Sequence, residues 1–503
     1  MTRLGFLLDS DSCIGCHACT VACKSEHDVP LGVNRTWVKY IETGSFPNVS
    51  RHFSVMRCNQ CDDAPCMTIC PTNALYRAPN GVVDFNDDNC IGCKGCMNAC
   101  PYDAIYINPE TNTANKCNFC NHRIEQDLEP SCVVVCPTHA IKVADLDDPL
   151  NAATKIIARD DVAVRSPEQG TNPKVYYRGA DQASLNPLRT AIADDGMIWA
   201  DTTAAHPTVP AGSHGVVART AYTTPHQMTW KSKVSGYLVT KAIAAGVMLV
   251  AALLVLLGHS TEQAAVGVVP PMVAGAFLAL TGVLLVADLK QPGRFHYLIT
   301  RGSRDSWLVK GAYVLAGFAL CLAGWWGAGL ADADGVIEVL AIPTAVFAAG
   351  TAGYTAFLFA QCEGRDLWQT PLLLPTLLAQ AITAGGATYA VIDIGMDVPS
   401  ADAVHWAFLG GIVGTLALLW MEAASKGTPH VEAAMHVLTK GGQARKYRLG
   451  VGGLLLAGAL VVLNLAAAEV EPAVGAVAGG LALAALWAYE DAFVRAGQSV
   501  PLS

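Results

Sequence analysis

Eight long apolar segments dominate the second half of the chain. Each is long enough to cross the apolar core of a bilayer as an α-helix, which takes about 20 residues. Glycine and alanine recur within them and allow helices to approach one another closely in lipid. The segments cover residues 235–258, 264–287, 307–330, 337–361, 371–393, 402–424, 449–467 and 472–493. The pattern predicts an all-α bundle of eight transmembrane helices within residues 233–503.

The front of the chain has a different pattern, in which short apolar runs alternate with turns. Residues 74–76 and 82–84 flank an Asn80-Gly81 turn and predict a β-hairpin. Residues 104–107 predict the first strand of a second hairpin. Hairpins that alternate with short helices predict an α+β domain over residues 1–148.

Residues 149–232 contain no long periodic segment and predict a linker and docking segment between the two domains. Residues 174–177 predict an edge strand. Residues 160–186 carry aromatic and charged side chains and are candidates for docking onto a partner subunit. Residues 202–224 are rich in Thr, Ala, Pro and Gly, a composition typical of a tether.

Sixteen of the eighteen cysteines lie in the α+β region, in four groups of four. Groups one and three have the spacing C-x2-C-x2-C-x3-C, and groups two and four lengthen one gap but keep the final x3. Short spacing lets successive sulfurs converge on one iron–sulfur centre, and in bacterial runs of this kind the fourth cysteine ligates the neighbouring cluster. The groups are Cys13, Cys16, Cys19 and Cys23; Cys58, Cys61, Cys66 and Cys70; Cys90, Cys93, Cys96 and Cys100; and Cys117, Cys120, Cys132 and Cys136. Sixteen thiolates predict four [4Fe–4S] clusters, and the region reads as a double dicluster-ferredoxin domain.

Other uses of these cysteines fit the spacing less well. Zinc sites use C-x2-C pairs, but not a triplet closed by a fourth cysteine and a proline. Disulfide frameworks are typical of short secreted chains rather than of 503 residues. Residues 13–17 match the haem-attachment string C-x-x-C-H, but they lie inside a cluster run. The bundle has histidines at span positions only near membrane ends, at His259 and His405, so no haem is expected there either.

The composition agrees with a soluble domain joined to a membrane domain. Hydrophobic residues make up 52% of the chain and charged residues 15%. The net charge of −9 argues against a nucleic-acid partner. The N-terminus has neither an apolar signal-peptide core nor a twin arginine, so no signal peptide is expected.

Residues 1–148 resemble the four-cluster electron-transfer subunit of molybdoenzyme complexes of the DMSO reductase and polysulfide reductase type. The resemblance covers all four cysteine groups, and Pro71, Pro101 and Pro137 follow the last cysteine of groups two to four. It implies cross-paired ligation, in which each cluster takes three cysteines from one group and one from another. Set A would be Cys13, Cys16, Cys19 and Cys136; set B Cys23, Cys117, Cys120 and Cys132; set C Cys58, Cys61, Cys66 and Cys100; and set D Cys70, Cys90, Cys93 and Cys96.

The membrane half resembles the eight-span, quinone-reactive subunit family of polysulfide reductase. The residues that carry this resemblance are 288–295 after the second span and 354–371 around the loop after the fourth span. The resemblance implies a site for quinone or quinol at the membrane face nearest the clusters.

Seven polar side chains are candidates for this quinone site. Tyr237 and Lys241 are four residues apart and share one helix face, and ionisable residues inside spans are costly and often functional. A quinone carbonyl needs a hydrogen-bond donor and a proton source, which Tyr, Lys and His supply. The candidates are Tyr237, Lys241, Asp288, Arg294, His296, Tyr354 and Gln361. Structural alternatives stay open: Lys241 as a snorkelling side chain, Asp288 and Arg294 as a loop pair, and Tyr354 as a belt aromatic.

Basic residues lie on one side of the predicted bundle. The loops after spans two, four and six, with the C-terminal tail, hold many Lys and Arg residues, whereas the loops after spans one, three, five and seven hold none. Lys and Arg mark the cytoplasmic side, so the cluster domain is predicted to face the cytoplasm from a bacterial or archaeal cell membrane. In the alternative, the cluster domain is exported together with a partner and faces outward. The basic residues of the loops would then serve to dock the cluster domain on the bundle.

Together these patterns predict a fused electron-transfer and membrane-anchor subunit of a respiratory molybdenum or tungsten oxidoreductase. Electrons would pass through four [4Fe–4S] clusters between a molybdopterin catalytic subunit on a separate chain and quinone in the membrane. The sequence shows no catalytic triad, phosphate loop or dinucleotide fingerprint, so no catalytic residue is assigned. Two alternatives stay open: a proton-translocating module that uses Lys241, Glu422 and Asp393, and a structural anchor without a quinone site.

Overall fold

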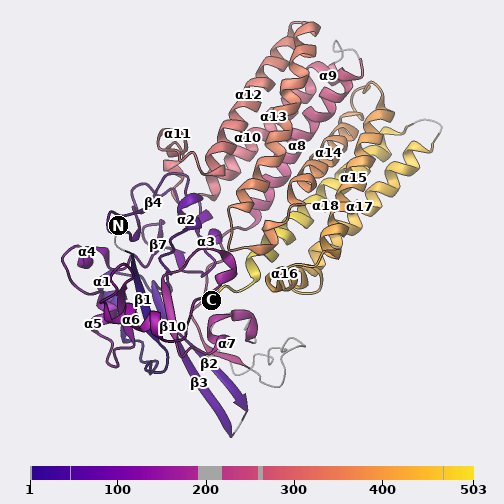
Figure 1. Cartoon of the computed structure of the whole chain (residues 1–503). Helices are drawn as coiled ribbons and strands as arrows, with labels where there is room; N and C mark the ends of the chain where they lie inside the picture. Colours follow the sequence, from indigo (N-terminus) through magenta and orange to yellow (C-terminus); the bar gives the residue numbers. More distant parts are fainter. Residues whose placement is uncertain (1–2, 46, 191–217, 259–263, 468–469) are drawn as a thin grey trace.

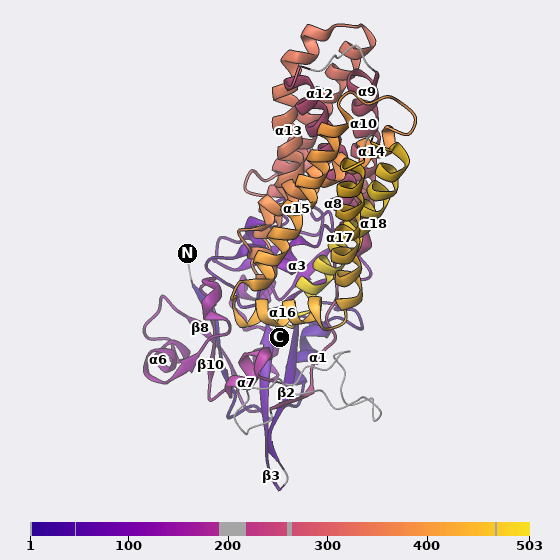
Figure 2. The same ribbon diagram turned by 90° about the vertical axis from the view of Figure 1, so that its right-hand side faces the viewer.

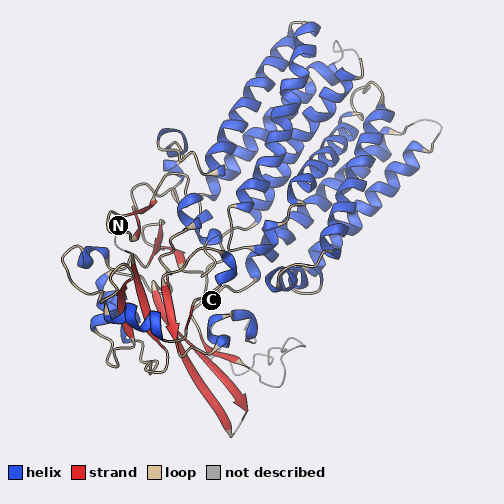
Figure 3. Ribbon diagram, in the orientation of Figure 1, coloured by secondary structure: helices blue, strands red, loops and turns tan. Residues whose placement is uncertain are grey.

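The computed structural model describes residues 3–45, 47–190, 218–258, 264–467 and 470–503. An α+β cluster domain and a long helical bundle lie end to end, as two views at right angles show (Figures 1 and 2). Within the described residues, every strand belongs to the cluster domain (Figure 3). The predicted fold class, a ferredoxin-like α+β domain followed by a helical membrane bundle, is confirmed.

The central sheet of the described cluster domain has the strand order β8 (Ile141–Asp145), β1 (Leu4–Asp9), β10 (Val175–Arg178) and β9 (Val162–Ala163). β10 pairs in parallel with β1 and antiparallel with β9, so the edge strand predicted at residues 174–177 is in fact an inner strand. A parallel pair needs a long connection, and residues 10–174, which include all four cysteine groups and α6 (Ala152–Arg159), provide it. The cluster domain therefore continues past the boundary expected at residue 148, because β9 and β10 complete its sheet.

A second sheet projects from the cluster domain, away from the bundle (Figure 1). β2 (Thr36–Ser45) and β3 (Asn48–Arg57) form a long antiparallel hairpin, and β11 (Arg219–Tyr222) pairs with β2. The end of the tether predicted over residues 202–224 is thus a strand, since β2 offers it a free edge. Residues 202–217 of that prediction lie outside the described residues.

Two short hairpins and several short helices frame the cysteine groups. β4 (Leu75–Arg77) pairs with β5 (Val83–Phe85), and β6 (Ile105–Ile107) pairs with β7 (Ala114–Lys116), so both predicted hairpins are confirmed. Each of α1 to α5 contains a cysteine or directly follows one. The helices are α1 (Ala18–Glu26), α2 (Pro65–Thr68), α3 (Gly95–Ala99), α4 (Asn121–Ile124) and α5 (Ser131–Val134), and α7 (Gln182–Leu185) lies further along the chain.

Eight long helices form the bundle within the described residues and coincide with the eight predicted spans. They are α8 (Ser232–Leu256), α9 with α10 (Ala264–Gly267 and Val269–Asp288), α12 (Trp307–Leu330), α13 (Asp334–Ala360), α14 (Leu373–Ile392), α15 (Ala401–Ala424), α17 (Ala444–Leu465) and α18 (Pro472–Ser499). Among the described helices, seven are apolar enough to cross a membrane on length and composition, and α14 is the one that falls short. α14 packs against α8, α13, α15 and α18. Its Gln380 and threonines are therefore buried against protein, which removes the need for a strongly apolar surface.

α8 lies inside the bundle and is almost wholly buried. Its backbone approaches that of α14 so closely that a Cβ atom on Gly246 would lie 1.9 Å from the carbonyl oxygen of Ala381. Gly385 on α14 faces Gly246 in the same way. Helix packing in lipid depends on such close backbone contact, which explains the abundance of small residues in these spans. The short helices α11 (Tyr297–Thr300) and α16 (Pro429–Thr439) lie in loops on the cluster-domain side of the bundle (Figure 1).

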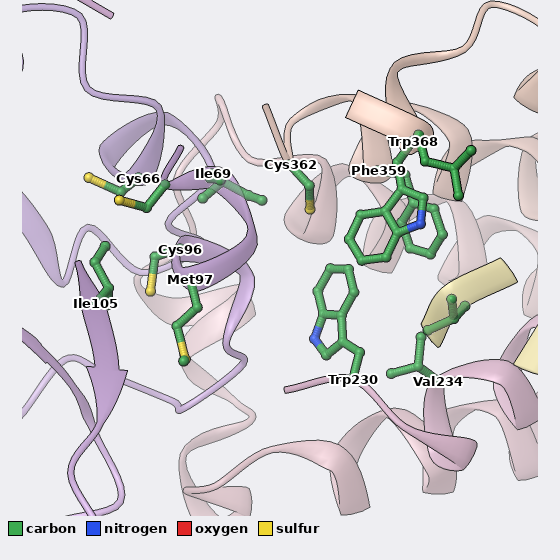
Figure 4. Close-up of a cluster of buried hydrophobic side chains, with 14 of the residues drawn as sticks. Cys66, Ile69, Cys96, Met97, Ile105, Trp230, Val234, Phe359, Cys362 and Trp368 are labelled. Carbon is green, nitrogen blue, oxygen red and sulfur yellow. The ribbon is translucent and has the colours of Figure 1, made fainter. Parts of the chain in front are cut away.

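The cluster domain docks on the loops at one end of the bundle. The junction is joined by hydrogen bonds from Lys290 N to Gly92 O (3.1 Å), Gln291 N to Ile91 O (3.1 Å), Ser303 N to Pro71 O (2.7 Å) and Ser306 Oγ to Ile69 O (2.8 Å). One buried apolar core crosses the junction, with Cys66, Cys96 and Met97 on one side and an aromatic group on the other (Figure 4). The segment considered for docking onto a partner also contributes, because Gln169 Nε2 donates to Asp366 Oδ1 at 3.0 Å.

Candidate functional site

Three of the four cysteine sets each surround a cavity of their own. The cysteines of set A line a cavity of about 310 Å³, those of set C one of about 330 Å³ and those of set D one of about 380 Å³. In set B, Cys23 lies within electrostatic range of Cys117, Cys120 and Cys132. Each set joins cysteines from two groups that are distant in sequence. The structure therefore brings together the residues that cross-paired ligation requires.

Left-handed backbone positions turn the cysteine loops inward. His17 and Lys94, with φ of 60° and 65°, stand immediately before α1 and α3, and Gly15 and Gly92 lie two residues earlier with φ of 71° and 67°. Such positive φ angles are uncommon outside glycine. Two reversals within a few residues let the successive sulfurs of one run face the same cavity.

The chemistry of the cysteine sets fits thiolate-bound metal clusters. Burial raises the pKa of the Cys61 thiol to about 12, because a bare thiolate would lose its hydration there. Bound metal charge reverses this preference and deprotonates a coordinating thiol. The backbone N–H groups of Ala114 and Ala140 donate to Cys90 Sγ and Cys136 Sγ at 3.3 and 3.2 Å, as suits negative sulfur. Among the described residues, no three His, Cys, Asp or Glu side chains form a site for a single metal ion.

The four sets form a continuous row in the order A, B, C, D. Neighbouring sets are linked by cysteine pairs that interact electrostatically: Cys19 with Cys132, Cys117 with Cys58, and Cys66 with Cys96. The ends of the row differ in their surroundings. Cys16 in set A is exposed at the surface, whereas Cys93 in set D faces the junction with the bundle.

An apolar cavity of about 680 Å³ lies between set D and the bundle. Cys93 lines it on the side of the cluster domain, and Tyr237 on α8 and Asp288 at the end of α10 line it on the side of the bundle. The remaining walls are mostly apolar side chains such as Leu285 and Leu298. A concave apolar site with a few convergent polar groups is typical of a site for a small organic molecule.

An ion pair between the two domains holds the polar edge of this cavity. Lys94 Nζ lies 2.7 Å from Asp288 Oδ2, and the two side chains are only 6% and 16% exposed. Lys94 directly follows Cys93, so the pair fixes the cysteine loop of set D against the end of α10. The loop pair between Asp288 and Arg294 that the sequence left open is therefore not what the structure shows.

Lys241 and Tyr354 lie behind Tyr237, deeper in the bundle. Lys241 is fully buried on α8, and its Nζ donates to Thr355 Oγ1. The Lys241 ammonium group lies 5.0 Å from the centre of the Tyr354 ring and 5.9 Å from that of Tyr237. A side chain in this position does not snorkel to the membrane surface.

The other three candidates make contacts elsewhere, and in the described structure none of them lines the cavity. Arg294 Nη1 donates to the carbonyl oxygens of Asp87 and Cys90 at 2.6 and 3.0 Å. His296 is exposed and packs against Tyr297. Gln361 accepts a hydrogen bond from Trp307 N and donates one to Asp305 O, both at 2.8 Å. Arg294 and Gln361 thus stabilise loops.

Sequence reasoning missed Lys94 and Trp230. Trp230 Nε1 donates to the carbonyl oxygen of Cys93 at 3.2 Å, and its ring stacks on Phe359 and Trp368. Figure 4 shows these three rings at the junction, across from Cys96 and Cys66. A basic residue inside a cysteine run and an acidic residue at the end of a span were the signals that could have indicated the pair between Lys94 and Asp288.

Of the residues considered for a proton relay, Lys241 and Glu422 both lie within electrostatic range of Glu490, whereas Asp393 lies apart from them. Asp393 follows α14, and its Oδ1 accepts a hydrogen bond from Val398 N at 3.2 Å. Glu422 lies near the opposite end of the bundle, in the last turn of α15. The buried acidic residue that interacts with Lys241 is Glu490 on α18, a residue that the sequence did not single out.

These features define the class: an iron–sulfur electron-transfer protein whose cluster domain is fused to a multi-pass membrane domain. Residues 49–146 match the family model described as a 4Fe-4S dicluster domain, and residues 221–500 match the one described as polysulphide reductase, NrfD. The protein belongs to the polysulphide reductase NrfD family and carries a 4Fe-4S dicluster domain in front of the membrane domain. Both predicted resemblances are confirmed.

Curated relatives of the protein include subunits of reductases. One subunit of the tetrathionate reductase of Salmonella typhimurium is 40% identical over 190 residues, which is 37% of this chain and 76% of the relative. One component of the polysulfide reductase of Wolinella succinogenes is 39% identical over 177 residues, 35% of this chain and 93% of the relative. The thiosulfate reductase electron transfer subunit PhsB of Salmonella typhi is 46% identical over 145 residues, 28% of this chain and 76% of the relative.

Proposed function

We propose that the chain relays electrons between a molybdenum- or tungsten-pterin catalytic subunit and membrane quinone, through four [4Fe–4S] clusters held by sets A to D. The observation that carries this proposal is the continuous row of cysteine sets, from exposed Cys16 to Cys93 in the wall of the apolar cavity. Bound [4Fe–4S] clusters supply one-electron transfer. The chain supplies the sixteen thiolates, the N–H donors to sulfur and the order of the four sets.

The apolar cavity is the proposed site for quinone or quinol. Its walls suit a ring with a long apolar tail, and its position beside Cys93 places the ring close to set D. Reduction of a quinone takes up two protons with two electrons, so the site needs groups that exchange protons. The Tyr237 hydroxyl is the proposed hydrogen-bond partner of a quinone carbonyl. Asp288 is the proposed proton-exchanging group, and Lys94 balances its charge.

The end of the row at set A is the proposed contact with the catalytic subunit. Close to Cys16 in sequence, the apolar side chains of Ile14 and Val21 are 59% and 64% exposed. Exposed apolar side chains that gather at one place are typical of an interaction surface. The relatives named as subunits of tetrathionate, polysulfide and thiosulfate reductases support a reductase as the partner.

A second candidate function is the transport of protons through the bundle, and one observation favours it. Lys241, Gln380 and Glu490 come from α8, α14 and α18, and all three are almost fully buried. Glu490 interacts with Lys241 and lies beside Gln380. Ionisable residues in a membrane interior are costly and often mark a proton path. This group lies behind Tyr237 and is the proposed route by which protons reach the quinone site.

We further propose that the cluster domain faces the cytoplasm. The basic residues Lys426, Lys440 and Arg445 lie on its side of the bundle, and the loops of the opposite side contain no Lys or Arg. In the outward-facing alternative, the basic loops serve to dock the cluster domain. Arg294 and Arg365 do form hydrogen bonds with the cluster domain, which agrees with that alternative. A protease added to inside-out vesicles is expected to digest the cluster domain, and digestion in right-side-out vesicles would reverse the assignment.

The relay is tested on the full chain, purified anaerobically in mild detergent from its own membranes with its co-purifying subunits. We expect about sixteen irons per chain, four for each of four cubanes, and molybdenum or tungsten in a larger partner chain. Addition of quinol is expected to reduce the clusters, as followed by electron paramagnetic resonance. An iron content well below about sixteen per chain would contradict the proposal of four clusters. If quinol does not reduce the clusters and quinone does not oxidise them, the chain is a structural anchor without a quinone site.

A further inference from the structure

Two cationic side chains are buried between successive cysteine sets without a carboxylate partner. Arg57 and Lys116 are both 0% exposed. Among the residues that the structure describes, neither forms an ion pair with Asp or Glu. Two further buried lysines do have carboxylate partners: Lys94 contacts Asp288, and Lys174 contacts Asp62 at 2.9 Å.

Arg57 lies at the junction of sets A and B. As the last residue of β3, it places its guanidinium group 4.3 Å from the centre of the Phe6 ring, and Nη1 donates to Cys132 Sγ at 3.3 Å. Its Nε and Nη2 atoms are buried and have no hydrogen-bond partner. The cysteines within its electrostatic range are Cys132 and Cys117 of set B and Cys19 of set A.

Lys116 lies at the junction of sets B and C. It is the last residue of β7 and directly precedes Cys117 of set B. Its Nζ donates to the carbonyl oxygens of Val83 and Cys117. It also lies within electrostatic range of Cys66 of set C. Carbonyl oxygens satisfy its hydrogen bonds but leave its positive charge without a protein counter-charge.

A buried cation without an anionic partner is strongly unfavourable, so negative charge must lie close to both side chains in the working protein. A [4Fe–4S] cluster with four thiolates carries net negative charge, and one-electron reduction adds one more unit. A fixed neighbouring cation therefore stabilises the reduced form more than the oxidised form, and net charge is one of the determinants of cluster potential.

We propose that Arg57 raises the reduction potentials of the clusters in sets A and B, and that Lys116 does so for sets B and C. This inference rests on the proposed four-cluster relay. Arg57 and Lys116 are not ligands and touch no substrate; they act through the clusters beside them. Set B lies next to both cations and is the cluster whose potential they raise most.

The test is a redox titration, followed by electron paramagnetic resonance, of the full chain with its co-purifying subunits. In Arg57→Gln, the ratio of reduced to oxidised cluster at fixed ambient potential is expected to fall at least tenfold for sets A and B, which corresponds to 59 mV for a one-electron couple. Arg57→Lys keeps the charge and is expected to retain most of the original ratio. Lys116→Gln is expected to lower sets B and C. Arg3→Gln is the matched control, because Arg3 is half exposed and paired with Asp62.

Each outcome separates this inference from the relay itself. Unchanged potentials in Arg57→Gln and Lys116→Gln, with full iron content, would overturn the inference and leave the relay intact. If Arg57→Gln loses iron and Arg57→Lys keeps it, Lys116→Gln decides: lowered potentials of sets B and C support the inference, and unchanged potentials overturn it. If Arg57→Lys also loses iron, the guanidinium serves packing and the inference is wrong. Fewer than four clusters in the unmodified protein would instead contradict the relay.

Discussion

The cluster domain and the membrane bundle treat buried charge in opposite ways. The interior of the cluster domain holds many buried cations, which include Arg35, Lys39, Arg57, Lys116, Arg165 and Lys174. In the described part of the bundle, the buried charged side chains are Lys241, Glu490 and Asp491 in the helices and Arg365 in the loop after α13, and His405 on α15 is also buried. A domain that holds negative metal clusters needs internal positive charge, whereas a bundle in lipid tolerates an ionisable group only where it is paired or has a function. Buried charge thus has a structural role in the cluster domain, whereas in the bundle it indicates candidates for a functional role.

The largest expected effect comes from breaking the row of cysteines in the cluster domain. Cys66→Ala removes a thiolate of set C in the middle of the row, so iron should fall by about a quarter, four of about sixteen. Electron transfer from quinol to the catalytic partner should fall to background, because the row is interrupted. Iron analysis and quinol-dependent turnover measure both effects. Cys321→Ala is the matched control, since Cys321 lies on α12 in the bundle and belongs to no set. Full iron content in Cys66→Ala would exclude Cys66 as a ligand.

The next effect concerns the ion pair that joins the two domains. Asp288→Asn leaves Lys94 buried without its partner, and breaking a buried pair costs about 3 kcal/mol of unfolding free energy. The double variant Lys94→Met/Asp288→Leu should recover most of this stability, because it removes both charges. Thermal unfolding in detergent measures the coupling between the two changes.

Quinol turnover of the same variants separates two roles of Asp288. If Asp288 exchanges protons with quinol, turnover should stay low in the double variant although stability returns. If turnover recovers together with stability, the pair between Lys94 and Asp288 is purely structural. Another residue must then exchange protons with quinol.

A smaller effect is expected from the hydroxyl groups of two tyrosines. Tyr237 lines the cavity and Tyr354 lies behind it against Lys241. Tyr237→Phe removes one hydrogen bond to the quinone, and a loss of about 1.4 kcal/mol lowers quinol turnover about tenfold. Tyr354→Phe keeps the ring that faces Lys241 and should change turnover by less than about threefold, since no hydrogen bond to quinone is lost. Equal effects of the two variants would place the quinone deeper in the bundle than the cavity.

Most of the fold could be predicted because its signals are local. Cysteine spacing identified the cluster domain, and apolar runs of membrane length marked all eight helices, including α14. The parallel pairing of β1 with β10 could not be predicted, because it joins residues about 170 positions apart whose short apolar pattern fits an inner strand and an edge strand equally well.

The proposed quinone site could be predicted only in part, because the walls of its cavity come from both domains. Tyr237 and Asp288 carried a signal as polar residues in or at the end of apolar spans. Lys94 carried only a weak signal, as a basic residue inside a cysteine run, and Trp230 carried none, since the roles of both depend on how the cluster domain docks on the bundle. Arg294 and Gln361 were selected for lying on the correct side of the membrane, yet hydrogen bonds to backbone groups hold them in loops.

The smallest expected effect tests a residue that the sequence suggested and the structure places outside the cavity. His296 is exposed beside α11, so His296→Ala removes no buried contact. Surface substitutions of this kind usually change free energies by no more than about 0.5 kcal/mol, so quinol turnover should stay within about twofold. Steady-state measurements of kcat and KM for quinol check this, with Tyr237→Phe alongside. A tenfold loss in His296→Ala would mean that quinone also uses the polar surface beside α11. The contrast between a charged cluster domain and a sparingly charged bundle would then fail at their junction, because an exposed loop residue would be performing the chemistry assigned to the buried cavity.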